Sequence, residues 1–415
     1  MILSSEQEHA IELCCDLNNR IASVTGGAGT GKTLVLGHIH KELSKKYSIA
    51  LCAPTGRAAK RIQELTGVRA KTIHKLLEFP SPADDIQTSD DDDNEGELTF
   101  ESFHEPRRCR FNPFEEQIII VDESSMVGPE LYRYLISALR KNGVIRFFGD
   151  NNQLLPVEDG EPPFRTVLAK FPSTELTYNF RSGDDVVSNA YRILQGKVPI
   201  RNDRFDVVYT DNPVLELIRL VERHPEYGDD DHQVIMPTRK GSVGTLRVNP
   251  SIQVKLNKGP ELLRLPRFES NDNDLVVRAK DKFLWCKNDY GLNLFNGEIG
   301  RITKIDTEDG TLWLRTGEGR NVEVPPRLRM YNAYLHTTIN YDPRKQLELG
   351  YAITTHKSQG SEFDTIIYCM SRNAAFLLNR NNFYTAVTRA KRKVIVVCDR
   401  RAMGLALRRE KRDDR

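Results

Sequence analysis

Residues near the start of the chain have the types and spacing of a phosphate-binding loop. Residues 26–33 read GGAGTGKT and fit the pattern G-x-x-x-x-G-K-[ST]. The glycines let backbone N–H groups close around phosphates, Lys32 can neutralise the β- and γ-phosphates, and the Thr33 hydroxyl suits a Mg²⁺ ligand. The pattern predicts a bound nucleoside triphosphate and leaves open what its hydrolysis drives. The predicted binding residues are Gly26, Gly27, Ala28, Gly29, Thr30, Gly31, Lys32 and Thr33.

Two adjacent carboxylates can complete a hydrolytic site with this loop. Asp122 and Glu123 directly follow an apolar run at residues 117–121. An acidic residue at the end of a buried strand can hold Mg²⁺ through water, and a second carboxylate can orient or deprotonate an attacking water. We assign Asp122 to the metal and Glu123 to the water. Gln153, which follows another apolar run, is a candidate to contact the γ-phosphate.

Two arginines far along the chain are candidates for the same phosphate. Arg181 follows a Pro-containing link, and Arg389 lies more than two hundred residues later. An arginine delivered from another domain can stabilise the charge of a phosphoryl-transfer transition state. The two positions therefore predict a site that a second domain completes.

The elements that must position these residues alternate between strand and helix. Apolar runs at 20–24, 47–53, 117–121 and 144–148 predict strands, and 32–44 is expected to be a helix with its positive end at the phosphates. Alternation of this kind is typical of a parallel sheet with crossover helices. Each strand ends in small or polar residues, where open α/β sheets bind ligands.

Composition narrows the class of protein. The chain has 415 residues, 39% of them hydrophobic and 28% charged, which allows two or three domains. No apolar run approaches the roughly 18 residues of a membrane-spanning helix, and the first residues lack an export signal, so we expect a cytoplasmic protein without a membrane partner. The seven cysteines include no C-x-x-C pair, which predicts neither a disulfide framework nor a zinc site.

Charge is distributed unevenly, although the net charge is only +2. Residues 84–97 hold eight acidic side chains and no basic one, whereas residues 107–110 supply three arginines and the tail from 400 is again Arg-rich. A solvated loop and a solvated helix end are the simplest interpretations of these runs. Net charge by itself does not predict a nucleic-acid partner.

The order of the motifs resembles that of superfamily 1B DNA helicases of the RecD-like group, which includes small phage helicases of the Dda type. The resemblance covers nearly the whole chain. The motifs that carry it are Gln7, GGAGTGKT at 26–33, APTGRAAK at 53–60, TIH at 72–74, VDESSM at 121–126, GDNNQLLP at 149–156, Arg181, YAITTHKSQGSE at 351–362 and YTAVTR at 384–389. Residues 288–290 (NDY) and 295–300 (FNGEIG) also resemble a RecD-like segment in an inserted β domain.

The resemblance implies an α/β fold with two RecA-like P-loop motor domains, each a parallel sheet flanked by helices, and two small insertions. The first motor domain, with the ATP site, is expected at 1–78 and 113–172, interrupted at 79–112 by a pin-type insertion. The second is expected at 173–263 and 346–415, interrupted at 264–345 by an SH3-like β domain.

The resemblance also assigns roles to single residues. Gln7 is expected to read the adenine edge, Phe180 to stack on the base and Glu362 to touch the ribose. Arg181 and Arg389 are expected to reach the γ-phosphate, which Gln153 couples to DNA. The positions expected along the DNA strand are Pro54, Thr55, Thr72, His74, Thr355, His356 and Lys357. Such side chains contact phosphates without reading sequence, although a helix-capping threonine or a hydrogen-bonded loop histidine is the ordinary alternative.

The pin insertion departs from a simple hairpin. Its run of four aspartates, residues 90–93, would repel DNA phosphates, so we expect a disordered loop there and a short pin from 98–103 and 109–111. The aromatic residue that meets the junction is left open among Phe100, Phe103 and Phe111. Translocation is thus better supported by the sequence than strand separation.

The sequence predicts an ATP-dependent DNA helicase and translocase that uses ATP and Mg²⁺ and moves 5′ to 3′ by resemblance. Its expected partners are single-stranded DNA, single-strand/duplex junctions and replication or recombination proteins, and it is expected to be a monomer. The alternatives are a superfamily 1 RNA helicase, because backbone contacts do not distinguish the sugars, and a translocase without strand separation. Residues 303–306 (TKID) match a GTPase base-reading pattern, and a nucleotide-regulated binding module would need only the first half of the chain.

Overall fold

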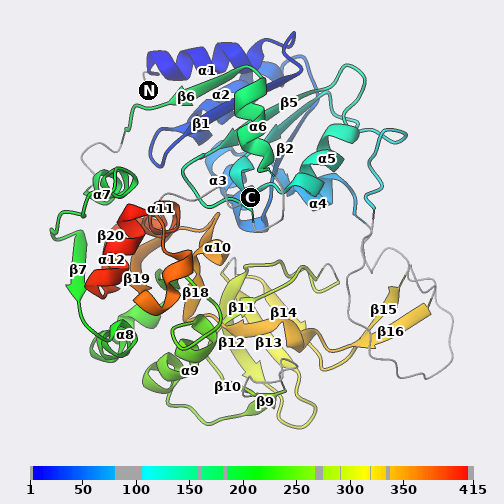
Figure 1. Ribbon diagram of the computed structural model, residues 1–415. Helices are drawn as coiled ribbons and strands as arrows, with labels where there is room; N and C mark the ends of the chain where they lie inside the picture. Colours follow the sequence, from blue (N-terminus) through cyan, green and yellow to red (C-terminus); the bar gives the residue numbers. More distant parts are fainter. Residues whose placement is uncertain are drawn as a thin grey trace.

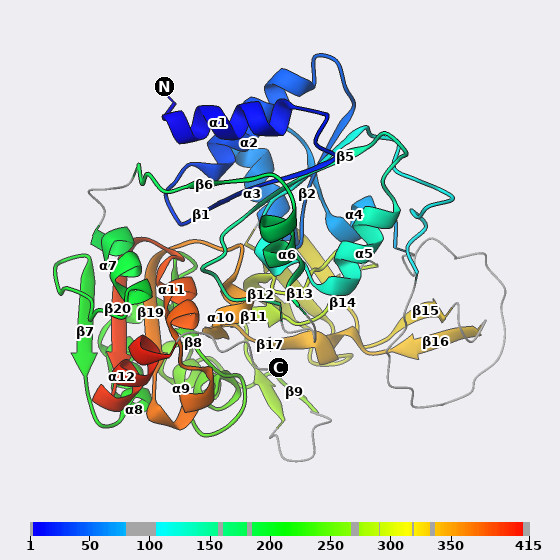
Figure 2. The ribbon, with the colours of Figure 1, turned by 45° about the horizontal axis from the view of Figure 1, so that its top comes forward.

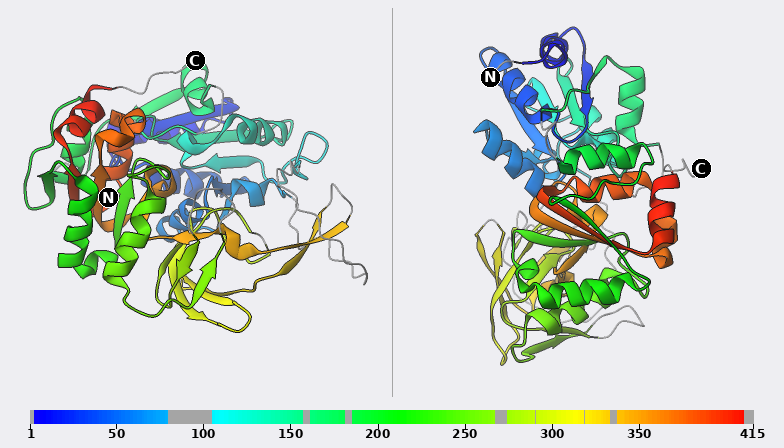
Figure 3. Two further views of the ribbon diagram at one scale, coloured as in Figure 1. Left: turned by 60° about the horizontal axis from the view of Figure 1, so that its bottom comes forward. Right: turned by 90° about the vertical axis from the view of Figure 1, so that its left-hand side faces the viewer.

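A computed structural model describes residues 3–79, 105–156, 161–180, 185–266, 274–289, 291–317, 319–332 and 337–409. Two α/β domains lie one above the other, and an antiparallel sheet lies beside the second (Figure 1 and Figure 3). The coarse prediction of parallel sheets flanked by helices is confirmed. Most of the predicted pin insertion lies outside the described residues.

The first domain contains a six-stranded parallel sheet in the order β3-β2-β4-β5-β1-β6. Its strands are β1 (Ile21–Gly26), β2 (Ile49–Ala53), β3 (Ala70–Thr72), β4 (Ile118–Val121), β5 (Val144–Gly149) and β6 (Ser173–Leu176). Its helices are α1 (Ser5–Cys15), α2 (Lys32–Leu43), α3 (Gly56–Thr66), α4 (Ile73–Leu76), α5 (Pro129–Ser137) and α6 (Pro163–Lys170), with a short 3₁₀ turn η1 (Ser124–Met126). The first sheet extends past the boundary expected at residue 172, because β6 pairs with β1.

Helices cover both faces of this sheet. Alternate residues of β4 enter different cores: Ile118 and Ile120 pack with α1, α2 and α3, whereas Ile119 and Val121 pack with α4, α5 and α6. A strand buried on both faces has a continuously apolar sequence, which is why this run was predictable as a central strand. Figure 2 shows α1 crossing the domain beside α2 and β6.

The second domain contains a five-stranded parallel sheet in the order β18-β8-β19-β20-β7. Its strands are β7 (Phe205–Tyr209), β8 (His232–Met236), β18 (Ala352–Thr354), β19 (Phe363–Met370) and β20 (Ala390–Cys398). Its helices are α7 (Asp185–Leu194), α8 (Pro213–Arg223), α9 (Thr245–Leu256), α10 (Thr355–Ser358), α11 (Arg380–Val387) and α12 (Arg400–Arg408), with 3₁₀ turns η2 (Pro225–Gly228) and η4 (Arg372–Leu377).

Between β8 and β18 the chain forms an inserted set of antiparallel strands. Five of them make one sheet in the order β14-β13-β12-β11-β17. They are β11 (Lys282–Trp285), β12 (Ile299–Ile305), β13 (Leu312–Thr316), β14 (Asn321–Val324) and β17 (Leu347–Leu349), the last preceded by the 3₁₀ turn η3 (Pro343–Gln346). Two separate pairs are β9 (Leu263–Leu265) with β10 (Leu275–Val277), and β15 (Leu328–Asn332) with β16 (Thr337–Tyr341). Strand β17 begins just past the insertion boundary expected at residue 345.

Candidate functional site

The phosphate-binding loop connects the end of β1 to the start of α2. Gly29 and Gly31 have φ values of 83° and 82°, a left-handed conformation that favours glycine. Gly31 is also the N-cap of α2, so the backbone N–H groups at the positive end of this helix face the loop. The Lys32 ammonium donates to the carbonyl oxygens of Gly26, at 2.6 Å, and Gly27, at 3.0 Å. The fold thus supplies the loop that the sequence predicts.

The predicted carboxylate pair directly follows β4. Glu123 has a φ of 49°, and its N–H donates to Asp122 Oδ1 over 2.8 Å. Burial, with the adjacent Glu123 charge, raises the pKa of Asp122 to about 6. The Glu123 Oε2 atom is buried and has no hydrogen-bond partner among the described residues. An unsatisfied buried acceptor is unusual in a protein interior and fits a ligand or water that takes its place there.

The donor set also fits Mg²⁺. No group of three or more His, Cys, Asp or Glu in the described part of the chain could hold a metal. Mg²⁺ usually retains waters and is held by one or two carboxylates together with substrate phosphates. Thr33 and Asp122 suit such a site, which the nucleotide itself would complete.

Gln153 is joined to a buried aspartate at the end of β5. Its Nε2 lies 3.5 Å from Asp150 Oδ2, and its Oε1 is buried without a partner among the described residues. Asp150 is fully buried, and this burial raises the pKa of its carboxyl, although Lys32 acts in the opposite direction. Asp150 lies within the GDNNQLLP motif, but the sequence did not indicate its role.

At the opposite end of the loop, α1 and an aromatic pair surround Gly31. Gln7 donates from Nε2 to the Thr30 carbonyl over 3.2 Å, and it closes a capping box with Ser4. Phe180 is 47% exposed, and its N–H donates to the Gly29 carbonyl over 3.1 Å. The structure therefore brings the two residues predicted to bind the base to the same loop.

Three further residues at this end, Glu6, Thr177 and Tyr178, were not predicted. The Glu6 carboxylate accepts hydrogen bonds from Thr177 and from the Tyr178 N–H, which lies 3.0 Å away. The Tyr178 ring packs edge-on against Phe180, with 4.9 Å between centroids. These contacts hold the aromatic segment against α1. A glutamate one position before Gln7 carries no distinctive sequence signal, so only the structure identifies it.

Two of the residues predicted to reach the phosphate or ribose from the second domain, Arg389 and Glu362, have other partners. Arg389 is 4% exposed and donates to the Thr385 carbonyl over 3.1 Å and to Thr388 Oγ1 over 3.3 Å, so it is bound to its own helix end. The Glu362 carboxylate forms an ion pair with Arg61 of α3 at 2.7 Å. Arg181 lies outside the described residues. The roles of these residues stay predictions.

Hydrogen bonds join the two α/β domains beside the loop, and we call this set the polar seam. The Tyr384 hydroxyl accepts from the Ala28 N–H over 3.0 Å and donates to Asp150 Oδ2 over 2.8 Å. Farther along, the Leu154 N–H donates to Thr385 Oγ1 over 2.9 Å. The remaining members are Asn381 Nδ2 to the Asn152 carbonyl at 2.8 Å, Gln359 Nε2 to the Leu154 carbonyl at 3.0 Å, and Arg57 to Ser361 Oγ at 2.6 Å.

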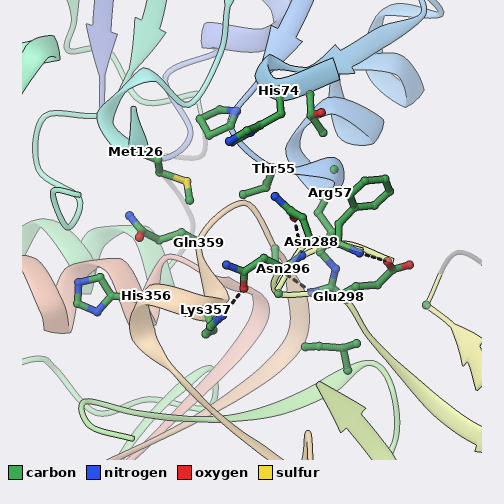
Figure 4. Close-up of a pocket in the computed structure, with 18 residues that line it drawn as sticks. Thr55, Arg57, His74, Met126, Asn288, Asn296, Glu298, His356, Lys357 and Gln359 are labelled. Carbon is green, nitrogen blue, oxygen red and sulfur yellow. Dashed lines mark hydrogen bonds between the residues drawn. The ribbon is translucent and has the colours of Figure 1, made fainter. Parts of the chain in front are cut away.

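Beyond the polar seam lies a cavity of about 340 Å³ that both α/β domains and the inserted strands line (Figure 4). Six of the seven residues predicted to contact DNA line it, namely Pro54, Thr55, Thr72, His74, His356 and Lys357. The inserted strands add Asn288, Phe295, Asn296 and Glu298, which the sequence did not predict as site residues. Gln359 lines the cavity and also belongs to the polar seam.

Two basic residues that line the cavity, His74 and Lys357, and the nearby Lys75 contact different groups. Burial lowers the pKa of His74, which favours its neutral form, and also lowers the pKa of Lys357. The Lys357 ammonium donates to Asn296 Oδ1 and to the Cys286 carbonyl, which lies 3.2 Å away. Lys75 lies over the Phe295 ring at 4.7 Å. Insertion residues therefore hold cationic side chains of both α/β domains.

The structure places Thr355, one of the residues predicted along the DNA strand, away from the cavity. Thr355 is fully buried, does not line the cavity, and donates to Asn382 Oδ1 over 2.7 Å. Thr55 and Thr72 do line it, although their hydroxyls also cap α3 and α4 by accepting the N–H groups of Ala58 and Lys75. In the pair Thr354–Thr355 at the start of α10, Thr355 is buried, and the motif alone does not reveal which of the two threonines faces the core.

Comparison with known proteins agrees with this arrangement. The AAA domain family matches residues 2–206, and the UvrD-like helicase C-terminal domain family matches residues 349–397. The chain is 29% identical over 417 residues to the ATP-dependent RecD2 DNA helicase of Deinococcus radiodurans, across 99% of this chain. It is 28% identical to the RecBCD enzyme subunit RecD of Mycolicibacterium smegmatis, across 95% of this chain and 71% of that subunit. The chain is therefore similar to RecD-type DNA helicases along nearly its whole length.

The chain spans only 51% of the length of the Deinococcus relative. Its fold is similar to that of the Pif1 helicase from Bacteroides solved with ADP-AlF3 and single-stranded DNA, with a TM-score of 0.56, 21% identity, and coverage of 95% of this chain and 92% of that one. Within the described residues of the RecD-like chain, no helix is long and apolar enough to cross a membrane.

The GTPase alternative does not fit the RecD-like chain. Its base-reading pattern, residues 303–306, begins within β12 of the antiparallel sheet. The Thr303 hydroxyl donates to the Trp313 carbonyl over 3.0 Å, and Lys304 lies over the Trp313 ring at 4.3 Å. These residues are part of a strand pair in the insertion, whereas the phosphate-binding loop lies in the first domain.

Proposed function

We propose that the protein is an ATP-dependent DNA helicase and translocase that holds single-stranded DNA in the cavity while ATP is hydrolysed at the polar seam. One observation carries this proposal: the phosphate-binding loop and the cavity are connected through the same polar seam. Tyr384 contacts Ala28 of the loop, its neighbour Thr385 contacts Leu154, and Leu154 contacts Gln359 in the cavity wall. A change at the phosphates can therefore reach the cavity through a few hydrogen bonds.

At the nucleotide, the predicted residues are assigned five roles. The loop N–H groups and Lys32 bind the phosphates, and Thr33 with Asp122 holds Mg²⁺, which supplies charge stabilisation to the transferred phosphoryl group. Glu123 orients the attacking water, and its unsatisfied buried oxygen supports that role. Gln7, Phe180 and Glu362 bind the adenosine, and Phe180 offers an exposed ring beside the loop. Arg181 and Arg389 complete the site from the second domain.

In the cavity, a nucleic-acid strand would contact all three parts of the molecule. Hydroxyl and imidazole groups of Thr55, Thr72, His74 and His356 suit sugar and phosphate oxygens, which position the strand without reading its sequence. The Phe295 ring suits stacking with a base. The insertion, proposed as an SH3-like domain, would thereby also help to hold the nucleic acid.

For the protein to move along DNA, its contacts with the strand have to change as ATP binds and is hydrolysed. ATP would close the two domains proposed as RecA-like motors, and hydrolysis would let them reopen. For Arg389 to reach the γ-phosphate, its guanidinium has to leave the Thr385 carbonyl and Thr388 that now bind it. The polar seam suits such a cycle because its bonds can be exchanged for bonds with water or ligand.

Strand separation and 5′ to 3′ polarity are further parts of the proposal. Phe111 is 94% exposed on a turn in which Cys109 and Asn112 pair, at the base of the proposed pin. Phe100 and Phe103 lie outside the described residues. Single-stranded DNA and its junctions with duplex are the proposed substrates, and replication or recombination proteins the proposed partners of a monomer in the cytoplasm.

The phosphate site is tested first by Lys32→Ala. Loss of the ammonium should abolish DNA-stimulated ATP hydrolysis while the protein stays folded, as measured by phosphate release and circular dichroism. Lys41→Ala changes an exposed lysine of the same helix and should retain full turnover. Unchanged turnover in Lys32→Ala would remove the loop from the nucleotide site.

The nucleic-acid substrate is tested by unwinding of forked and single-tailed duplexes, with DNA compared with RNA. The proposal expects unwinding of DNA with a 5′ tail. Activity only with a 3′ tail would overturn the polarity, and preference for RNA would favour an RNA helicase. Directional ATP-driven movement without unwinding would leave a translocase.

A further inference from the structure

The Tyr384 hydroxyl lies in the phosphate-binding loop although its residue belongs to α11 of the second domain. Tyr384 is fully buried, and burial keeps its pKa well above the usual range, so the hydroxyl stays protonated. It accepts from the Ala28 N–H and donates to Asp150 Oδ2. A β-carbon added at Gly27 would lie 3.0 Å from the same hydroxyl, which shows how closely the loop packs against it.

The Tyr384 contact occupies a hydrogen-bond donor of the loop that would otherwise be available to a phosphate. Backbone N–H groups in such a loop bind phosphate oxygens, but here the tyrosine oxygen satisfies the N–H of Ala28. The Lys32 ammonium is similarly directed to the carbonyl oxygens of Gly26 and Gly27. Protein oxygens therefore occupy hydrogen-bond donors of the loop in this structure.

The Asp150 carboxylate, which accepts a hydrogen bond from the Tyr384 hydroxyl, also lies beside Gln153. Asp150 Oδ2 accepts from Tyr384 and lies 3.5 Å from Gln153 Nε2, while Asp150 Oδ1 accepts from the Asn152 N–H over 3.0 Å. The Asp150 carboxylate is thus shared between the second domain and a residue placed at the γ-phosphate. Loss of the Tyr384 bond would leave Gln153 and the Asn152 N–H as its remaining partners among the described residues.

We propose that Tyr384 is a positioning residue that latches α11 onto the nucleotide-free phosphate loop and Asp150, and that the ATP phosphates displace its hydroxyl from Ala28. Displacement would free Asp150 and Gln153 to rearrange at the same moment that phosphate arrives. ATP binding would then be linked to release of one domain contact before the closed, hydrolysing arrangement forms. This inference rests on the proposed function, since it needs ATP at residues 26–33.

A latch makes different predictions from a tyrosine that only stabilises the fold. The latch bonds exist only without nucleotide, so their loss should weaken the free state and leave the bound state unchanged. By mass action, ATP affinity should then rise. A purely structural bond would be present in both states, and its loss would lower both melting temperatures without changing affinity.

Tyr384→Phe tests the latch because it removes only the hydroxyl and keeps the ring against Tyr191 and the core. Binding of the slowly hydrolysed analogue ATPγS should become about five- to tenfold tighter, because only the free state loses its hydrogen bonds to Ala28 and Asp150. KM for ATP should fall with it, whereas kcat should not rise in proportion. The melting temperature should drop without nucleotide and match wild type at saturating ATPγS, which also shows that the variant folds.

Tyr191→Phe is the matched control. Its hydroxyl lies near the position of a Gly27 β-carbon but makes no hydrogen bond with a described residue, so affinity should not change. Unchanged or weaker ATPγS binding by Tyr384→Phe would overturn the latch, the weaker result making the hydroxyl a ligand of bound nucleotide. If wild type itself bound no ATPγS, the proposed function would fail instead.

Discussion

The second α/β domain meets its two neighbours through different kinds of contact. Toward the inserted strands it shares one hydrophobic core, in which Val234 and Met236 of β8 pack with Phe283 and Trp285 of β11 and Leu349 of β17. We call this contact the apolar seam. Toward the first domain, the described hydrophobic clusters do not cross: those of the first domain end at Leu176, and the others begin at Val186.

The difference indicates which parts move together. Separating the apolar seam would expose large buried side chains to water, at a cost that grows with the apolar area. Opening the polar seam exchanges hydrogen bonds within the protein for hydrogen bonds with water, and the net cost of each is small. The second domain and its insertion should therefore move as one body against the first domain.

The largest expected effect is on turnover, at an arginine of the second domain next to the polar seam. Arg389→Ala should lower DNA-stimulated turnover about a thousand-fold if the side chain reaches the transition state. ATP binding should be retained, and the free energy of unfolding should change little because the lost bonds lie within one helix end. Steady-state hydrolysis and ATPγS titration measure the two effects, with Arg392→Ala as an exposed control on β20. Normal turnover would remove Arg389 from the site.

The next effect concerns the apolar seam. Phe283→Ala removes a fully buried ring and should lower the free energy of unfolding by about 3–5 kcal/mol. Denaturant unfolding should show the second domain and the insertion unfolding together. Phe376→Ala, at a ring that is 74% exposed, should cost far less. Unfolding of the insertion alone, at lower denaturant, would contradict a shared core.

A smaller, pH-dependent effect comes from a buried lysine within the apolar seam. Lys282 donates to the carbonyl oxygens of Asp229, at 3.1 Å, and His232, at 2.8 Å, and burial lowers its pKa to about 7. Between pH 7 and its ordinary value of 10.5, the unfolded chain binds this proton and the folded chain does not. The contribution of Lys282 to stability therefore rises with pH in this window and is lowest below pH 7.

Lys282→Met removes this titration. The free energy of unfolding of wild type minus that of the variant should increase by about 1 kcal/mol per pH unit above pH 7.5. Chemical unfolding at several pH values measures the difference, and subtraction removes the titration of the other groups. Lys287→Met, at an exposed lysine beyond β11, should give a flat difference. A flat difference for Lys282→Met would mean that the buried ammonium keeps its proton.

The smallest effect tests the polar seam directly. Asn381→Ala removes the bond to the Asn152 carbonyl and should lower the free energy of unfolding by about 1 kcal/mol or less. Asn373→Ala, at an exposed position of η4, serves as the control for loss of an asparagine. A cost near that of Phe283→Ala would show that the two seams are equally strong and would remove the basis for relative movement.

Much of the first domain could be predicted from sequence because its signals are local. The apolar run before Asp122 is continuous because β4 is buried on both faces, and the glycines of residues 26–33 are required by the backbone of the loop itself. Six of the seven residues expected at the DNA line one cavity, since each lies near the end of a strand in one of the two parallel sheets.

The sequence by itself therefore determined the phosphate loop and the carboxylates beside it, because each depends on residues that are adjacent or share one sheet edge. Only the tertiary structure decided which groups meet across the domains. Tyr384 and Ala28 are 356 residues apart, and their bond depends on how two separately folded sheets are oriented. Packing within the second domain buries Thr355 and places Arg389 against its own helix end, and the position of the insertion brings Phe295 into the cavity. No local pattern encodes such contacts, since their energy arises between side chains that only the packed domains bring together.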